Sequence, residues 1–413
     1  MAFSKHELPI LRRSSLTLSP VEAAARVEGL RGSVFFDSAR EGGSRFSILA
    51  AEPSFVMRGR TDRDWDALRR VLLERSTSGV DRGFPRGFAA GCVAYDGEFE
   101  FGFYDEPAVF EHREGAWIAT EAFEHRIEKA SSPSHRELLM ERFETGIERE
   151  AFCRMVWRAQ EYIAAGDIYQ VNLSHRFSAP WCGDAWRFYQ ALRSCSPAPF
   201  AAWLNLSEKK VLSSSPECFL RMSGSRIRTR PIKGTRPRRA DAAADESSAY
   251  DLITSPKELA ELIMITDLER NDLGRICEFG SVKVTELLKL ERHEQVFHLV
   301  STVDGQMRPD VDHVTALRAC FPGGSITGAP KKRACEIIAE LEPVPRGLYT
   351  GAIGYFGYNG ESQFSIAIRT LILEHGVAHF HVGAGIVADS DPESEYQETL
   401  DKASGILVAA SRA

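Results

Sequence analysis

Residues 348–388 read LYTGAIGYFGYNGESQFSIAIRTLILEHGVAHFHVGAGIVA, and this stretch decides the fold class. Its aromatic and β-branched runs, separated by glycine-containing turns, predict long strands at 348–358, 362–373 and 379–388. Several strands follow one another here in a chain that also has helical patterns. This arrangement favours an α+β fold over a doubly wound parallel sheet.

Upstream, helical and strand-like patterns alternate. The spacing predicts helices at 150–165, 184–194 and 330–342, the last begun by Pro330 and ended by Pro343, and strands at 169–177 and 201–205. Before residue 130, shorter strand-like segments at 33–36, 45–50 and 87–95 lie between glycines and prolines. These segments indicate a sheet rather than a helical bundle.

The clearest candidate for a domain boundary in the chain, referred to below as the seam, lies at 129–149. This stretch is rich in charge and poor in apolar residues, and Ser-Ser-Pro-Ser at 131–134 interrupts it. We therefore expect a boundary near 130–150, with an N-terminal region at 1–130 and a second body at 150–413.

Composition excludes several classes of function. The 413 residues are 43% hydrophobic and carry a formal net charge of −7, which disfavours nucleic acid and anionic membranes as partners. No apolar run approaches the roughly 20 residues of a membrane span, so we expect a cytoplasmic protein. The eight cysteines include no Cys-x-x-Cys pair, and we expect reduced core residues rather than a zinc site.

Two pairs of glutamates stand out. Glu258 and Glu261 lie one turn apart on a helix expected at 257–269, and Glu395 and Glu398 repeat this spacing after a helix start at 390–393, with Lys402 on the same face. Like charges placed in this way repel each other, and a Mg²⁺ ion between the helices would remove the repulsion. The alternative is that each pair lies on a solvated helix face.

A lysine in a basic setting is a candidate nucleophile. Lys233 lies in Pro-Ile-Lys-Gly-Thr at 231–235, in a stretch that also contains Arg228, Arg230, Arg236, Arg238 and Arg239. Nearby cations favour the neutral amine that nucleophilic catalysis requires, and the flanking Pro and Gly-Thr suggest a turn. The alternative is a solvated basic loop. Glu217, in Ser-Pro-Glu at 215–217, is a candidate general acid if it is desolvated.

Two glycine-rich segments leave alternatives open. Residues 321–330 lead into a helix but lack the Lys-Ser/Thr of a nucleotide-binding loop, so they either offer backbone N–H groups to a carboxylate or form a plain turn. Gly383-Ala384-Gly385 interrupts a strand and indicates close approach of either a ligand or another strand.

Taken together, the motifs of this chain resemble those of the chorismate-utilising enzymes, which include anthranilate synthase component I, aminodeoxychorismate synthase component I, isochorismate synthase and salicylate synthase. The ordered landmarks are Gly-Asp-Ile-Tyr-Gln-Val-Asn-Leu-Ser at 166–174, Ser-Pro-Glu at 215–217, Pro-Ile-Lys-Gly-Thr at 231–235, Asp-Leu-Glu-Arg-Asn-Asp at 267–272, His-Leu-Val-Ser at 298–301, Phe-Pro-Gly-Gly at 321–324, Ile-Arg-Thr at 368–370 and Gly-Ala-Gly-Ile at 383–386. The resemblance implies the anthranilate synthase component I-like fold, in which two sheets pack face to face with helices outside.

The resemblance also implies a role for each site residue. It implies that Glu261 and Glu398 bind Mg²⁺ directly, that Glu258 and Glu395 support the ion through water, and that Glu217 protonates the leaving C4 hydroxyl of chorismate. The residues that the resemblance places around the substrate are Arg369, Tyr349, Lys402, Gly383 and Gly385 at its carboxylates, Thr235 on the pocket wall and His298 near the leaving group.

Two positions bear on which reaction the resemblance implies. The members that use water carry lysine where this chain has Gln170, and the anthranilate makers carry alanine where it has Lys233. The pair Gln170 and Lys233 resembles the members in which the lysine attacks C2 and ammonia then adds at C4 to give 4-amino-4-deoxychorismate. C2 amination to anthranilate is the alternative.

The chain contains no recognisable glutamine amidotransferase module. We therefore expect ammonia to come from a separate glutamine amidotransferase subunit or from solution.

Overall fold

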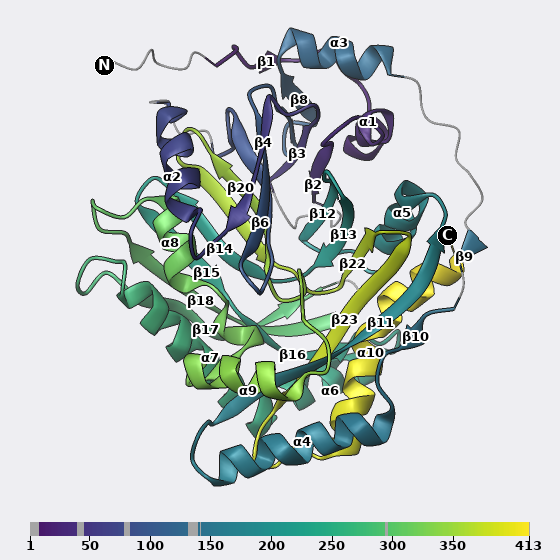
Figure 1. Cartoon of the computed structure of the whole chain (residues 1–413), viewed down its shortest axis with the longest axis vertical. Coiled ribbons are helices and arrows are strands. Elements are labelled where there is room, and N and C mark those ends of the chain that lie inside the picture. The colour runs from purple at the N-terminus through teal and green to yellow at the C-terminus, as the bar shows by residue number, and fades with distance from the viewer. Residues whose placement is uncertain are drawn as a thin grey trace.

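The computed structural model describes residues 8–38, 45–77, 83–130, 139–140, 142–293 and 296–412. The Ser-Ser-Pro-Ser stretch at 131–134 of the expected seam lies outside these ranges. Within them, two large antiparallel sheets form the body of the protein, and helices cover their outer faces (Figure 1).

The first sheet has 13 strands, in the order β1-β8-β7-β3-β2-β12-β13-β22-β23-β11-β10, with β9 and β19 also paired to β11. Its strands are β1 (Arg12–Arg13), β2 (Val34–Asp37), β3 (Phe46–Ala50), β7 (Ala108–Glu111), β8 (Ala116–Ala119), β9 (Leu139–Met140), β10 (Glu144–Thr145), β11 (Gln170–Cys182), β12 (Phe200–Asn205), β13 (Lys209–Ser215), β19 (Gly328–Ala329), β22 (Thr370–Glu374) and β23 (Val377–Ile386).

The second sheet has 10 strands, in the order β16-β18-β15-β14-β21-β20-β5-β6-β4, with β17 also paired to β18. Its strands are β4 (Phe55–Arg60), β5 (Phe88–Val93), β6 (Glu98–Tyr104), β14 (Cys218–Ser223), β15 (Arg226–Arg230), β16 (Ile232–Pro237), β17 (Lys283–Arg292), β18 (Val296–Gln306), β20 (Ala352–Gly357) and β21 (Glu361–Ile366). The N-terminal region therefore contributes strands to both sheets.

Side-chain alternation along the strands sends apolar residues to both faces of each sheet. Val34 of β2 and Ile353 of β20 belong to the layer between the sheets, whereas Phe35 faces outward. Figure 1 shows α5 and α10 on the outer side of the first sheet and α2, α7 and α8 on the outer side of the second. The helices are α1 (Pro20–Val27), α2 (Trp65–Glu74), α3 (Glu121–Lys129), α4 (Arg149–Ala164), α5 (Ala185–Cys195), α6 (Ala242–Ile253), α7 (Pro256–Gly274), α8 (His313–Cys320), α9 (Lys331–Leu341) and α10 (Pro392–Arg412).

The expected α+β fold with two facing sheets is confirmed. The helices expected at 150–165, 184–194, 257–269 and 330–342, and the one after residue 390, correspond to α4, α5, α7, α9 and α10. None of the helices in the described ranges is long and apolar enough to cross a membrane.

The single strand expected at 362–373 was wrong. The chain forms β21 in the second sheet, leaves it at Ala367, and forms β22 in the first sheet from Thr370 onward. Arg369 has φ +49, a left-handed value that ends an extended segment. Hydrophobic periodicity does not register this break because the residues on both sides are apolar.

A buried arginine ties the two sheets together. The Arg346 guanidinium donates to both oxygens of Glu342, at 2.9 and 2.7 Å, and to the carbonyl oxygens of Asn172 on β11, at 2.7 Å, and Ile326, at 3.0 Å. It also donates to the hydroxyl of Thr350, which precedes β20. Its side chain is 1% exposed and that of Glu342 is 4% exposed.

We expect Arg346→Met to destabilise the protein by about 3–5 kcal/mol, because it leaves Glu342 charged, buried and unpaired. The measurement is the free energy of unfolding from urea denaturation. Arg333→Met is the matched control, since Arg333 pairs with Glu336 and Asp167 at the surface, where loss of an ion pair costs about 1 kcal/mol or less. Equal losses in the two variants would contradict a special role for Arg346.

Candidate active site

The candidate site lies where the chain passes twice from one sheet to the other. Pro216 and Glu217 link β13 of the first sheet to β14 of the second, and residues 367–369 link β21 to β22. Each crossing is bonded to the strand that precedes the other crossing: the Ile366 N–H of β21 donates to the Glu217 carbonyl at 3.2 Å, and the Ser214 N–H of β13 donates to the Arg369 carbonyl at 3.0 Å. The sheets therefore bring Glu217 and Arg369 to one place.

Arg369 is a half-buried cation at this crossing. Burial lowers the pKa of its guanidinium. Among the described residues, no carboxylate or carbonyl pairs with it. It lines a cavity of about 470 Å³ together with Ile232 and His298. A desolvated arginine without a counter-ion is suited to bind a carboxylate.

The structure places Lys233 on strand β16 and not in the expected turn. Lys233 pairs with Leu299 and Thr235 with His298, and Gly234 between them forms a bulge with φ +70. The bulge provides the unusual backbone geometry that the Gly-Thr pair suggested, inside a strand. The Lys233 side chain is 14% exposed, and its ammonium lies 3.9 Å from Glu261.

The expected crowding of Lys233 by cations was wrong. Four of the five arginines near it in sequence have carboxylate partners of their own: Arg228 pairs with Asp304, Arg230 with Glu291, Arg236 with Glu258 and Arg238 with Asp245. Alternation along β15 and β16 turns neighbouring residues to different faces, so closeness in sequence does not bring these charges together.

Gln170 and Gly385 complete the surroundings of Lys233. Along β11, Val171 packs with α4 and α9, so Gln170 points to the opposite face and its amide donates to Glu261 at 3.3 Å. A Cβ at position 385 would lie 2.5 Å from that amide and 3.6 Å from the Lys233 nitrogen. A side chain at 385 would therefore have to displace the Gln170 amide from its place beside Glu261.

The four glutamates of the expected metal site lie near one another, but each is paired with a cation. The pairs are Glu258 with Arg236 at 3.3 Å, Glu261 with Lys233 at 3.9 Å, Glu395 with Lys257 at 2.9 Å and Glu398 with Lys402 at 2.7 Å. The repulsion inferred from sequence is therefore offset by four side chains of this protein. In the described ranges, no three acidic, histidine or cysteine side chains meet at metal-binding spacing.

The donor chemistry of this cluster nevertheless fits a hard cation. Burial raises the pKa of Glu261, the charges of Lys233 and Lys257 oppose this rise, and the charges of Glu258 and Glu398 add to it, so the carboxylates are close enough to repel one another. One oxygen of Glu395 is buried without a hydrogen-bond partner among the described residues. Carboxylate oxygens with spare acceptor capacity are the ligands that Mg²⁺ prefers.

Glu217 meets the condition set for a general acid. It is 5% exposed, and burial raises its pKa, against the opposing effects of a hydrogen bond from the Ser325 hydroxyl and of the charge on Lys233. The charge of Lys402 also acts on it, so the acid, the candidate nucleophile and the metal-site lysine share one environment. A carboxyl that holds its proton more tightly than usual is suited to proton donation.

The remaining expected site residues lie around this group. The Thr235 hydroxyl and His298 Nδ1 are hydrogen-bonded at 3.0 Å, and Lys402 donates to the carbonyl oxygen of Gly383 at 2.9 Å. A Cβ at position 383 would lie 2.8 Å from the hydroxyl of Tyr349, a buried residue. No direct contact joins Tyr349 or Arg369 to Lys233 in the described part of the chain.

Two buried residues near the site were not identified from the sequence. Glu269, on α7, accepts a hydrogen bond from the Gly324 N–H at 2.9 Å, and Ser325 contacts Glu217. The glycine-rich segment therefore gives a backbone N–H to a protein carboxylate. Helical periodicity could have identified Glu269, because residue 269 is eight positions after Glu261 and lies on the same buried face of α7.

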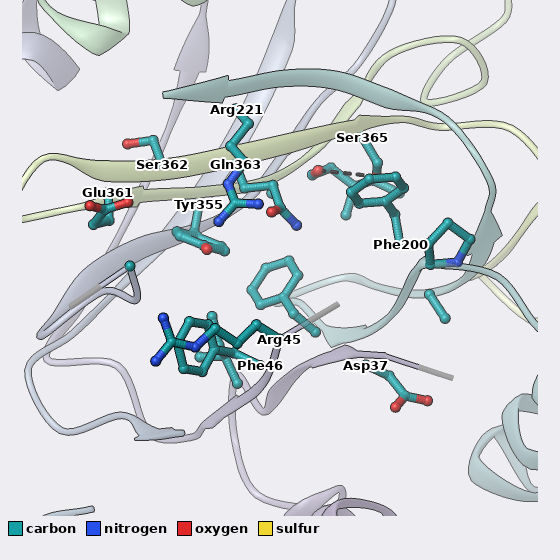
Figure 2. Close-up of a pocket in the computed structure, with 17 residues that line it drawn as sticks. Asp37, Arg45, Phe46, Phe200, Arg221, Tyr355, Glu361, Ser362, Gln363 and Ser365 are labelled. Atoms are coloured by element: carbon teal, nitrogen blue, oxygen red, sulfur yellow. Dashed lines mark hydrogen bonds between the residues drawn. The ribbon is translucent and has the colours of Figure 1, made fainter. Parts of the chain in front are cut away.

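A second, smaller cavity lies between the sheets. Figure 2 shows Arg221 and Gln363 reaching into it from the second sheet, and Arg45 and Phe46 approaching from the first. Its volume is about 40 Å³, far below the roughly 300 Å³ of typical ligand pockets. We therefore place the candidate active site at the sheet crossings.

Comparison with known proteins agrees with this geometry. Residues 40–408 match the family model described as chorismate binding enzyme. The chain belongs to this family. It is 36% identical to aminodeoxychorismate synthase component 1 of Bacillus subtilis, over 90% of each chain. It is 46% identical to anthranilate synthase component 1 of Thermus thermophilus, over 66% of this chain and 59% of that protein.

A solved structure of anthranilate synthase component I from Streptococcus pneumoniae has the same fold. The TM-score is 0.78 at 31% identity, covering 98% of this chain and 99% of that one. Family membership thus agrees with the motifs.

Proposed function

We propose that this enzyme aminates chorismate at C4 to give 4-amino-4-deoxychorismate, the precursor of 4-aminobenzoate and folate. The observation that carries the proposal is the position of the half-buried Lys233 amine, which lies beside Glu261 and Gly385 and shares the environment of Glu217. Similarity over 90% of the chain to a protein named aminodeoxychorismate synthase component 1 supports it.

In the proposed reaction, the Lys233 amine attacks C2 of chorismate while the ring double bonds shift and the C4 hydroxyl leaves. Glu217 donates the proton that converts this hydroxyl to water. Ammonia then adds at C4, and the C2–N bond to Lys233 breaks, which regenerates the amine. Chorismate and ammonia thus yield aminodeoxychorismate and water.

The surrounding residues orient the substrate in this proposal. The unpaired guanidinium of Arg369 and the hydroxyl of Tyr349 bind the enolpyruvyl carboxylate, and Lys402 and the backbone at Gly383 and Gly385 hold the ring carboxylate. Thr235 forms the pocket wall, and His298, held by the Thr235 hydroxyl, lies beside the leaving group. Burial of Tyr349 and His298, and partial burial of Arg369, strengthen their interaction with a charged substrate.

Mg²⁺ is part of the proposal, with Glu261 and Glu398 as direct ligands and Glu258 and Glu395 as supporting ones. The ion would supply Lewis-acid stabilisation of the ring carboxylate and the departing oxygen. Lys257 and Lys402, which now pair with Glu395 and Glu398, would compete with it for these carboxylates.

A glutamine amidotransferase subunit is the proposed source of ammonia. Several similar proteins are named as component 1 of their enzymes, which implies a second component. We propose that such a subunit delivers ammonia to the crossing of the two sheets.

Product analysis separates C4 amination from its rival. We expect the purified protein, given chorismate, ammonium and Mg²⁺, to form aminodeoxychorismate, which an added aminodeoxychorismate lyase converts to 4-aminobenzoate. Chromatography identifies each product. Fluorescent anthranilate formed without the added lyase would instead establish anthranilate synthesis.

The nucleophile has its own test. Lys233→Ala removes the amine and opens space at C2, so we expect no protein adduct by intact-mass spectrometry and a shift of the residual product toward anthranilate. Lys283→Ala, at an exposed position on β17, is the matched control and should retain the adduct. An identical adduct in Lys233→Ala would refute the assignment.

Glu261→Gln and Glu398→Gln test the metal site. Each replaces a charged ligand by a neutral one of the same shape, and we expect Mg²⁺ affinity by calorimetry to fall at least about 10-fold, with activity falling in parallel. Glu336→Gln on the exposed face of α9 is the control. Unchanged titrations in both site variants would place the ion elsewhere.

A further inference from the structure

Glu269 is a buried carboxyl that the proposed reaction does not use. It is 2% exposed, on the face of α7 that packs into the protein. One of its oxygens accepts the Gly324 N–H at 2.9 Å, and the other lies 3.4 Å from the hydroxyl of Thr229 on β15. The carboxyl therefore connects α7 to the turn at 323–326 and to the second sheet.

The turn at 323–326 reaches the candidate general acid one residue later. Gly324 packs so closely on α7 that a Cβ there would lie 2.7 Å from Leu268. Ser325 follows, 6% exposed, and its hydroxyl lies beside Glu217, where it lowers the pKa of that carboxyl. Gly324, whose N–H binds Glu269, and Ser325, which lies beside Glu217, are thus adjacent in the chain.

The charges around Glu269 leave it without a close ion pair among the described residues. Lys331, the cation whose charge acts on it, pairs with Asp272 and donates to the Cys320 carbonyl. Burial raises the pKa of Glu269 to about 7, Lys331 opposes this rise, and Asp272 and Glu217 add to it. Its contacts with the described residues are therefore hydrogen bonds, to the Gly324 backbone and to Thr229 on β15.

We propose that Glu269 is a positioning residue for the general acid: by holding the Gly324 N–H, it fixes the turn that presents the Ser325 hydroxyl to Glu217. This inference rests on the role proposed for Glu217 and adds to it the means by which that carboxyl is oriented. A hydroxyl donor fixed in place holds one carboxyl oxygen and leaves the other free to face the leaving group.

Four variants test the proposal. Glu269→Leu removes the acceptor, whereas Glu269→Gln keeps an acceptor oxygen of the same shape without the charge. Ser325→Ala removes only the contact with Glu217. Asp272→Asn is the matched control, because Asp272 is a buried carboxyl on the same helix that pairs with Lys331 and Arg275 and does not contact the turn.

We expect Glu269→Leu and Ser325→Ala each to lower kcat on the order of 10-fold to 100-fold, with KM for chorismate changed less than about 3-fold. Glu269→Gln should restore most of kcat. The double variant Glu269→Leu/Ser325→Ala should be no slower than Ser325→Ala alone, because both changes break one connection. Asp272→Asn should lose stability and keep kcat.

Titration of Glu217 in the free protein provides a readout that needs no turnover. Isotope-edited infrared spectra, with Glu217→Gln to assign the band, report its carboxyl. The charged groups that act on it are Lys233, Lys402 and Glu269. We expect Glu269→Leu to raise the pKa of Glu217 by about 0.5–1 unit relative to Glu269→Gln. We expect the same rise for Ser325→Ala relative to the parent protein.

Two results would overturn the proposal. The first is that Glu269→Leu has the same kcat and the same pKa of Glu217 as Glu269→Gln. The second is that the fold-losses in kcat of the two single variants multiply in the double variant. Failure of the proposed function has a different signature, namely a parent protein that consumes no chorismate or makes another product. The infrared titration still tests the connection in that case.

Discussion

The ion pair between Arg346 and Glu342 is the constraint on which the rest of the structure depends. Arg346 binds carbonyl groups on β11 and in the turn at 323–326, and a hydroxyl just before β20, while Glu342 accepts from both the backbone and the hydroxyl of Ser174. A buried charge must have all of its donors satisfied, so these segments have little freedom to shift. The turn that carries Ser325 and the strand that carries Gln170 are held by the same guanidinium.

This attachment matters because the candidate active site has no element of its own. Glu217 and Arg369 lie on two linkers between sheets, Lys233 on a bulged strand and Glu261 on a covering helix. The geometry of such a site depends on the packing of these four supports: the two linkers, the strand and the helix. Buried hydrogen bonds of Arg346 and Glu269 hold segments next to these supports, namely β11, the turn at 323–326 and β15, more closely than apolar contact alone, because hydrogen bonds are directional.

Charge balance is the second feature of the site. Four glutamates face four cations of the same chain, so the cluster is close to neutral without any ion. Under the proposed function, Mg²⁺ and an anionic substrate enter together, which adds charges of opposite sign and preserves this balance. A site built this way avoids the large cost of burying uncompensated charge in either state.

The sequence by itself determined the α+β class, most of the helices and strands, and the residue types of the site, because hydrophobic periodicity, caps and glycines are local properties. It failed where two segments meet. The break at Arg369, the bulge at Gly234, the separate carboxylate partners of the arginines around Lys233 and the burial of Glu269 were decided only by the tertiary structure. Each depends on which side chain or strand approaches from elsewhere in the chain, and local sequence carries no information on distance through space.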